Sequence, residues 1–142
     1  MPLQFVHPVQ RATHRIGLYV DELREQQLTQ GEAHILALLA SSSPLAVAEL
    51  HRGLAHKRST LTSILDRLAA RKLVTRKIGQ TDRRTFMIDL TARGRKLSRR
   101  IARHLGNLEK RVRRQVTTNE IRAFHKILSA LEAEAAKQNQ KS

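Results

Sequence analysis

Short polar and basic side chains gather on one face of a predicted helix over residues 58–71. The opposite face is apolar at steps of three and four residues, and it consists of Leu61, Ile64, Leu65 and Leu68. The polar face consists of Arg58, Ser59, Thr60, Thr62, Ser63 and Arg67. Hydroxyl and guanidinium groups on an exposed helix can hydrogen-bond to base edges in the major groove of double-stranded DNA. This segment therefore offers the chemistry of base recognition.

A second cluster of charged side chains lies in the polar segment 79–85. The residues on either side, 74–78 and 86–90, alternate between apolar and polar types, which is typical of strands. The segment between them contains Asp82, Arg83 and Arg84. Arginine at the tip of a hairpin suits the minor groove, whose negative potential attracts cations. The sequence thus predicts a β-hairpin with a basic tip.

The excess of positive charge is confined to two segments. The 142 residues carry a formal net charge of +15, which favours a polyanionic partner. Residues 57–84 hold nine basic and two acidic groups, and residues 93–114 hold ten basic and one acidic group. Lys57, Arg95 and Arg99 are candidate phosphate contacts. For the basic side of 93–114, an ordinary solvated helix face is a slightly better explanation than contact with DNA.

Several other chemistries are disfavoured. The chain has no cysteine, which excludes disulfides, thiolate metal sites and catalytic thiols. Its seven histidines form no His-x-x-x-His pair, and we find no phosphate-binding glycine loop, nucleophile elbow or paired-carboxylate site. We expect no metal, no cofactor and no enzymatic activity. Without a signal peptide or an apolar run of about 20 residues, we expect a cytoplasmic protein with no membrane partner.

The remaining elements position these clusters. Apolar spacing predicts a helix over about 8–27. A second helix starts at Thr29, which forms a capping box with Glu32, and stops before the turn-forming residues 41–44. A short segment at 45–47 and a short helix with Leu50 and Leu54 precede the polar helix. Long helices over about 91–116 and after the cap Thr118 follow the hairpin. The fold class is mostly α (α+β), with a helix-turn-helix followed by a two-strand wing.

The residues of this middle part resemble the MarR family of winged helix-turn-helix transcriptional regulators. The similarity rests on several short motifs in the order in which the family has them. They are Thr29-Gln30-Gly31-Glu32, Val47-Ala48-Glu49-Leu50, Ser59-Thr60-Leu61-Thr62, Leu65-Asp66-Arg67-Leu68, Asp82-Arg83-Arg84 and Ile88-Asp89-Leu90-Thr91-Ala92-Arg93-Gly94. The wing motif, an acid–arginine pair followed by Leu-Thr-x-x-Gly, makes the combination specific.

The resemblance implies a homodimer that reads the two half-sites of a pseudo-palindromic operator. Within a single domain over 1–142, residues 29–92 would form the DNA-binding winged helix-turn-helix. Residues 1–28 and 93–142 would form the helical dimerisation part. Family members are mostly repressors, and many release DNA when they bind a small aromatic or phenolic effector.

The resemblance also assigns roles to individual residues. The first turns of the recognition helix, with Arg58, Ser59, Thr60, Thr62 and Ser63, would contact bases. Arg67 would contact a phosphate, and Asp82 would hold Arg84 in position beside the additional cation Arg83. His14, Arg15, Tyr19 and His34 are candidate linings of an effector pocket, and ordinary interface or surface positions explain them at least as well.

Three features depart from the family pattern, and one of them is the basic side of residues 93–114, which is more strongly cationic than the resemblance implies. The other two are single positions. Lys57 stands where a capping serine is usual, and Lys72 stands where a helix-ending glycine is usual. An alternative function for the whole chain is an architectural protein that binds nucleic acid with weak specificity through its charge.

Overall fold

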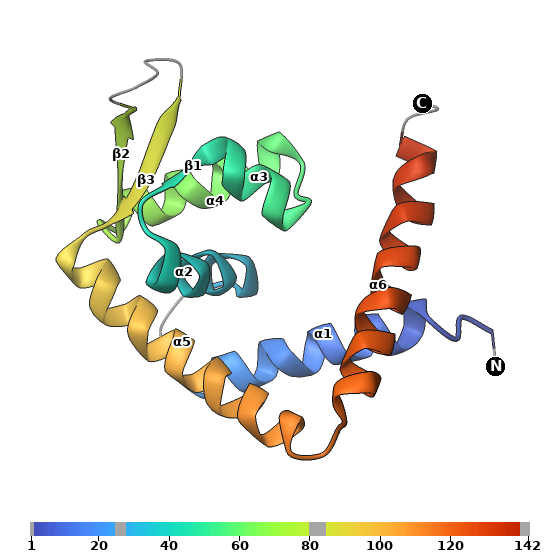
Figure 1. Ribbon diagram of the computed structural model, residues 1–142. Helices are drawn as coiled ribbons and strands as arrows, with labels where there is room; N and C mark the ends of the chain where they lie inside the picture. Colours follow the sequence, from blue (N-terminus) through green and yellow to red (C-terminus); the bar gives the residue numbers. More distant parts are fainter. Residues whose placement is uncertain (1, 25–27, 80–84, 140–142) are drawn as a thin grey trace. The chain divides into compact units, whose positions relative to one another are not determined.

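The computed structural model describes residues 2–24, 28–79 and 85–139 of the chain, with side chains up to residue 137. The elements are α1 (Val6–Asp21), α2 (Gln30–Ser42), β1 (Leu45–Ala46), α3 (Val47–Leu54), α4 (Arg58–Ala70), β2 (Val74–Ile78), β3 (Phe86–Leu90), α5 (Ala92–Arg113) and α6 (Thr118–Asn139) (Figure 1). They form two compact units, one of residues 17–105 and one of residues 1–16 with 106–142. The predicted mostly helical winged helix-turn-helix is confirmed. The division at residues 28 and 92 stays a prediction.

The unit of residues 17–105 contains a small antiparallel sheet with the strand order β1-β3-β2. The predicted hairpin is formed by β2 and β3, with Arg76 opposite Ile88 in register. The predicted short segment at 45–47 adds a third strand, because Leu45 pairs with Ile88 on the other edge of β3. The wing therefore joins the helix-turn-helix through the strand that leads into α3.

The core of this unit explains why α4 can present a polar face. The apolar side of α4 is buried, as predicted, and it packs with α2, the sheet and the first half of α5. The fully buried side chains include Ile35, Leu36, Leu39, Leu61, Leu65, Leu68, Leu73, Ile88 and Ile101. Burial on this scale stabilises the fold by roughly 1.5–3 kcal/mol for each large aliphatic side chain. With its apolar side fixed in this way, α4 must direct its polar side outward.

The start of α5 is fixed to the base of the wing by a close backbone approach. A Cβ atom on Gly94 would lie only 1.9 Å from the carbonyl oxygen of Leu73, so only glycine fits there. The hydroxyl of Thr91 donates to the Lys72 carbonyl at 2.7 Å and accepts from the Gly94 N–H at 3.0 Å. Lys72 has φ 59°, the left-handed conformation that its replacement of a helix-ending glycine suggested.

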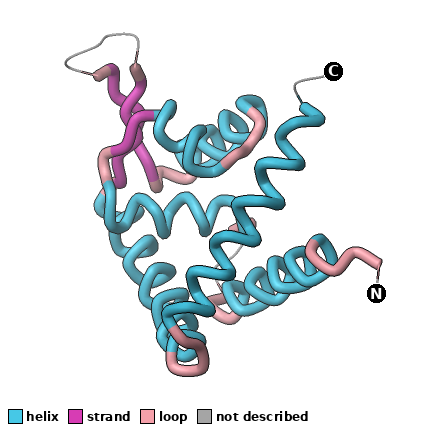
Figure 2. The backbone as a smooth tube through the Cα atoms, turned by 45° about the vertical axis from the view of Figure 1, so that its right-hand side comes forward, coloured by secondary structure: helices cyan, strands magenta, loops and turns pink. Residues whose placement is uncertain are grey.

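The unit of residues 1–16 and 106–142 consists of helices and the segments that connect or precede them, with no strand in the part that the structure describes (Figure 2). Several of its large apolar side chains are about half exposed, namely Phe5, Val6, Val112, Phe124 and Ile127. Full burial of an apolar side chain of α5 is confined to its first half, where Ile101 is buried. Val112, near the end of α5, is 49 % exposed.

Two predicted helix boundaries were wrong. The first helix ends at Asp21 rather than near residue 27, because the N–H groups of Glu22 and Leu23 bond three residues back and Arg24 adopts φ 55°. The cap of the last helix is Thr117 rather than Thr118. The hydroxyl of Thr117 accepts from the Glu120 N–H, and the Glu120 carboxylate accepts from the Thr117 N–H. Among the described residues, no helix combines the length and the apolarity that a membrane span requires.

Candidate nucleic-acid interface

The exposed face of α4 brings together the residues predicted to read bases. Arg58, Ser59, Thr60, Thr62 and Ser63 are all exposed. The N-cap residue, Lys57, adopts an extended conformation and makes no capping bond through its side chain. Its side chain is exposed beside the first turn of α4. The N-terminal end of this helix therefore presents hydroxyls and two cations together.

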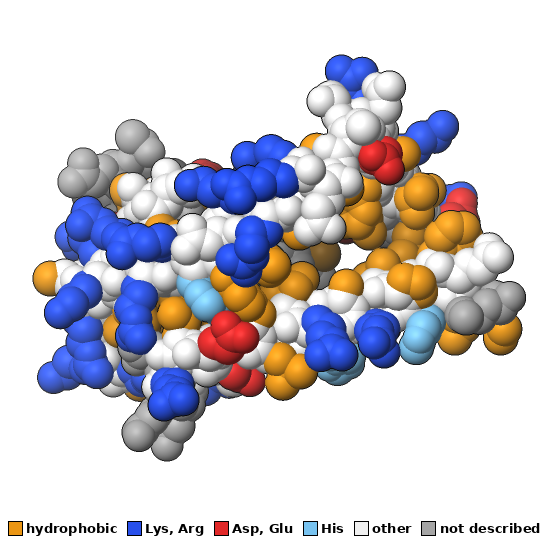
Figure 3. Space-filling model, turned by 90° about the horizontal axis from the view of Figure 1, so that it is seen from below, with side chains coloured by type: hydrophobic (Ala, Val, Ile, Leu, Met, Phe, Trp, Pro, Cys, Tyr) orange, Lys and Arg blue, Asp and Glu red, His pale blue; other side chains and the backbone are white. Residues whose placement is uncertain are grey.

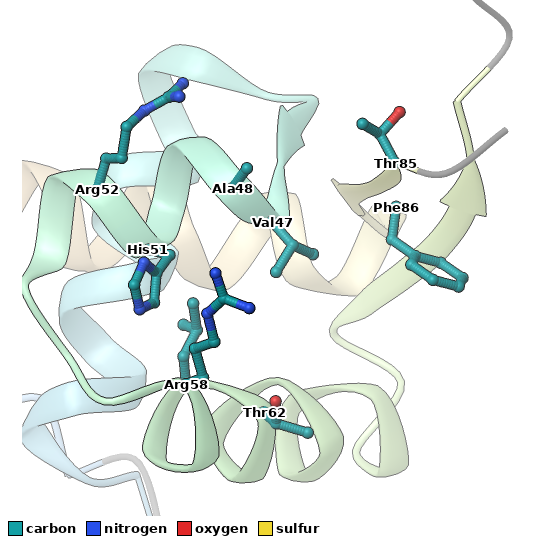
Figure 4. Close-up of a pocket in the computed structure, with 9 residues that line it drawn as sticks. Val47, Ala48, His51, Arg52, Arg58, Thr62, Thr85 and Phe86 are labelled. Carbon is teal, nitrogen blue, oxygen red and sulfur yellow. The ribbon is translucent and has the colours of Figure 1, made fainter. Parts of the chain in front are cut away.

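A hollow of about 450 Å³ lies between α3, α4 and the start of β3 (Figure 4). Its lining residues are Val47, Ala48, His51, Arg52, Arg58, Leu61, Thr62, Thr85 and Phe86. Arg58 and Thr62 thus share one concave surface with two basic side chains of α3, His51 and Arg52. The sequence reasoning missed these two, although a His-Arg pair in a short helix ahead of a recognition helix was a usable signal. The hollow widens the basic surface beyond α4.

Arg67 is engaged with a buried acid. Its Nε atom lies 3.3 Å from Oε1 of Glu32 on α2, and the Glu32 side chain is only 2 % exposed. Nη1 of Arg71 lies 3.7 Å from the other carboxylate oxygen. Two cations at the C-terminal end of α4 thus neutralise one buried carboxylate. Since the Arg67 side chain is still 52 % exposed, it has a structural partner on one side and solvent on the other.

Asp66 and Arg76 connect the recognition helix to the wing. The guanidinium of Arg76 on β2 donates to the carboxylate of Asp66 on α4. Both side chains are exposed to solvent. Lys77 follows Arg76 on the same strand, so β2 carries a further positive charge beside α4. The sequence reasoning assigned neither Arg76 nor Lys77 to the site.

The tip of the wing falls outside the described residues. Asp82, Arg83 and Arg84 belong to this tip, so their predicted roles stay predictions. The segment is closed at its base by a hydrogen bond from the Gly79 N–H to the Thr85 carbonyl at 2.7 Å.

Asp89 on β3 controls one of the candidate phosphate contacts. The hydroxyl of Ser43 donates to its carboxylate, and this bond is the main reason why the pKa of Asp89 is lowered. The Leu90 N–H and the charges of Arg95 and Lys77 act in the same direction, against the effect of burial. Nη2 of Arg95 lies 3.7 Å from this carboxylate. Arg95 is thus drawn toward the sheet, whereas Arg99 is exposed with no ion pair to a described residue.

The comparison with family models identifies the winged helix. Residues 28–86 match the model of the MarR family. Residues 28–86 are thus similar to the MarR family, and they are called the MarR domain below. The match spans α2, α3, α4 and the hairpin, which are the elements that build the surface described above. No curated protein matches the chain.

Solved structures extend the likeness of the MarR domain to nearly the whole chain. A Staphylococcus aureus MepR–DNA complex is 20 % identical, with a TM-score of 0.75 over 93 % of this chain and 98 % of that one. PcaV from Streptomyces coelicolor, in complex with its natural ligand, is 18 % identical, with a TM-score of 0.74 over 95 % and 97 %. A mutant Escherichia coli MarR with operator DNA is 22 % identical, with a TM-score of 0.70 over 92 % and 94 %. At these identities the likeness establishes the fold.

The four residues predicted to line an effector pocket differ from one another in burial and in their contacts. The ring of Tyr19 stacks on the ring of His104, with 3.8 Å between centroids and 7° between planes. The Tyr19 hydroxyl donates to the His104 carbonyl at 2.7 Å, and Nε2 of His104 lies 2.7 Å from the Tyr19 carbonyl. Partial burial, followed by the nearby His56, lowers the pKa of His34. His14 and Arg15 are exposed on α1.

Metal ligands do not converge in the MarR domain or its flanks as far as the structure describes them. No three His, Asp or Glu side chains in residues 2–24, 28–79 and 85–139 are placed to share one ion. His104 faces Tyr19 and has Glu22 at 3.9 Å.

Proposed function

We propose that the protein is a dimeric regulator of transcription that binds double-stranded DNA in a sequence-specific way. One observation carries this proposal: the five short polar and basic side chains at the start of α4 are all exposed, whereas the opposite side of α4 is buried. A helix held in this way can enter the major groove and direct Arg58, Ser59 and Thr62 toward base edges. The hairpin beside it would place Arg83 and Arg84 against an adjacent minor groove.

The homodimer is supported by the apolar side chains of residues 1–16 and 106–142. Val6, Val112, Phe124 and Ile127 are between 41 % and 56 % exposed, which is unusual for such residues on helices of a monomeric protein. A second copy that covers them would bury the apolar surface symmetrically. Two recognition helices in one dimer would then read the two halves of a pseudo-palindromic site.

Selection of bound duplexes from a random pool tests the proposal. The full-length protein should enrich a pseudo-palindrome. The double variant Arg58→Ala/Thr62→Ala should lose preference for it by about 30-fold or more, since two base contacts of about 1–3 kcal/mol each sum to at least about 2 kcal/mol. The variant Arg122→Ala/Thr118→Ala removes the same residue types from exposed positions of α6 and should keep the preference. If no palindrome is enriched, the proposal fails.

We further propose that the regulator is a cytoplasmic repressor that a small aromatic or phenolic compound releases from DNA. The MarR-family domain supports this, and PcaV provides a structural neighbour with a bound natural ligand. The candidate contacts remain His14, Arg15, Tyr19 and His34. A screen of aromatic acids for release of the selected duplex tests it. Release by a compound that also protects the protein from thermal unfolding supports it, and release by none of them contradicts it.

A weakly specific architectural protein is the second candidate, and the net charge of +15 favours it. The two functions differ in the ratio of specific to non-specific affinity. Competition between the selected duplex and random duplex at a fixed salt concentration separates them. A ratio near one would favour the architectural function.

A further inference from the structure

We infer that the outer face of α5 binds the phosphate backbone of a second DNA segment, separate from the one that α4 and the wing would read. The surface consists of Arg93, Lys96, Arg99 and Arg103, hereafter the α5 ridge. All four belong to the unit of residues 17–105. The inference goes beyond sequence reading by α4 and does not depend on it.

The α5 ridge is the side of α5 that the core leaves free. Gly94, Ser98 and Ile101 are buried, whereas the four cations are exposed. Lys96, Arg99 and Arg103 follow at steps of three and four residues, so they form one row on the side opposite Ile101. Figure 3, which shows the molecule from below the view of Figure 1, has Lys and Arg side chains gathered on this side.

The charges of the α5 ridge are not neutralised from within the described part of the chain. None of the four ridge cations forms an ion pair with a described acid, whereas the neighbouring Arg95 pairs with Asp89. Like charges three and four residues apart on a helix repel one another. A polyanion relieves this repulsion and gains entropy by releasing counterions. The ridge is about 15 Å long over ten residues, which matches about four phosphates of one DNA strand at 3.4 Å each.

The topology places the α5 ridge away from the recognition surface of the same unit. Strand β3 runs from the tip of the wing to its base, about 17 Å for five residues, and α5 begins at that base. The first turn of α4 lies about 18 Å from its last, and α4 leads into β2, whose Val74 pairs with Leu90 at the same base. The first turn of α4 and the far end of β3 therefore both lie away from the start of α5, and Figure 1 shows α5 leading away from β2 and β3. The ridge is thus assigned to a second duplex rather than to the one on α4 and the wing.

A bridging experiment with the full-length protein tests the inference. A biotinylated 40-base-pair random duplex is held on beads and loaded with protein, and capture of a second, labelled random duplex is measured from 50 to 200 mM salt. Capture per molecule of bound protein should fall by at least about ten-fold in Lys96→Gln/Arg99→Gln/Arg103→Gln. It should remain at the wild-type level in Arg11→Gln/Arg122→Gln/Lys126→Gln, which removes the same charge from exposed positions of α1 and α6.

Three outcomes would overturn the inference. The ridge variant would capture the second duplex as well as the wild type, or the control variant would lose capture equally, which would make net charge the cause. In the third outcome, the ridge change would abolish binding to vesicles with 30 % phosphatidylserine and leave duplex capture intact, which would assign the surface to membranes. Bridging that persists when no palindrome is enriched would refute the proposed sequence reading and support the ridge.

Discussion

Glu32 on α2 and Arg67 on α4 form an ion pair in which the carboxylate is almost completely buried and the guanidinium is half exposed. The two residues are 35 positions apart, and their pairing fixes α4 to the helix behind it. A buried carboxylate without a cation is strongly destabilising. The position of α4 therefore depends on a buried charge that is not part of its exposed polar face.

Removal of the cation from this pair should cost more than removal of the charge from the acid. Arg67→Ala leaves Glu32 with Arg71 alone at 3.7 Å, so we expect the free energy of unfolding to fall by about 2–3 kcal/mol. Glu32→Gln removes the buried charge itself and should cost about 1 kcal/mol. Chemical denaturation measures both. Arg52→Ala, at an exposed position of α3, should change stability by less than about 0.5 kcal/mol. Equal effects of Arg67→Ala and Arg52→Ala would show that the pair does not stabilise α4.

The two glycines of α5 should respond to alanine in opposite directions. Gly94→Ala places a methyl group on the Leu73 carbonyl, so we expect a loss of about 2–3 kcal/mol or more. At Gly106 a Cβ would meet no described atom within 4 Å, so Gly106→Ala should stabilise the helix by about 0.5–1 kcal/mol. Thermal unfolding of the two variants gives the comparison. A tolerated Gly94→Ala would contradict the close approach of α5 to the wing base.

The cap of α6 can be located by two neighbouring threonines. Thr117→Ala removes the hydroxyl that accepts from the Glu120 N–H and should lower stability by about 1 kcal/mol. The same bonding pattern lowers the pKa of Glu120, chiefly through the Thr117 N–H. Thr118→Ala should have almost no effect, because Thr118 lies inside the helix. The opposite order of effects would restore the cap that the sequence pattern predicted.

Asp89 predicts a specific dependence of stability on pH. Its pKa in the folded protein lies below the ordinary value of 3.8, mainly because Ser43 donates to the carboxylate. A lowered pKa stabilises the fold at every pH above the ordinary value, and the gain is lost as the pH falls through the folded pKa. The difference in unfolding free energy between wild type and Asp89→Asn should be constant above about pH 5 and shrink below about pH 4.

Ser43→Ala provides the control for this prediction. It removes the main cause of the shift and should return the pKa of Asp89 toward 3.8 in a carboxyl NMR titration. If the difference in unfolding free energy between wild type and Asp89→Asn does not vary with pH, titration of Asp89 does not contribute to the pH dependence of stability.

Local sequence patterns predicted most of the helices and strands, but they did not predict which side chains pair between elements. The capping box of Thr29 and Glu32 was predicted from spacing, and the Thr29 hydroxyl does accept from the Glu32 N–H at 3.1 Å. That the same Glu32 side chain would also reach Arg67 depends on how α2 and α4 pack, which no local spacing encodes. Thr117 and Thr118 are equally good caps by residue type, so the sequence cannot separate them. Only the backbone geometry identifies Thr117 as the cap.

The same distinction holds for the site. The polar face of α4 was visible because a helix alternates its faces with a fixed period. His51 and Arg52 were missed, since their place in the hollow follows from α3 lying beside α4. Arg95 lies near the sheet because it pairs with Asp89, which stands six residues earlier on β3, the strand that precedes α5.

The stack of Tyr19 on His104 gives the protein a single intrinsic optical probe. The chain has one tyrosine and no tryptophan, so its tyrosine fluorescence arises from a single place, where Tyr19 of α1 stacks on His104 of α5. Any change in the emission on ligand binding or on unfolding reports separation or rearrangement of these two rings. Conversely, the protein absorbs so weakly at 280 nm that nucleic acid carried through purification would dominate its spectrum.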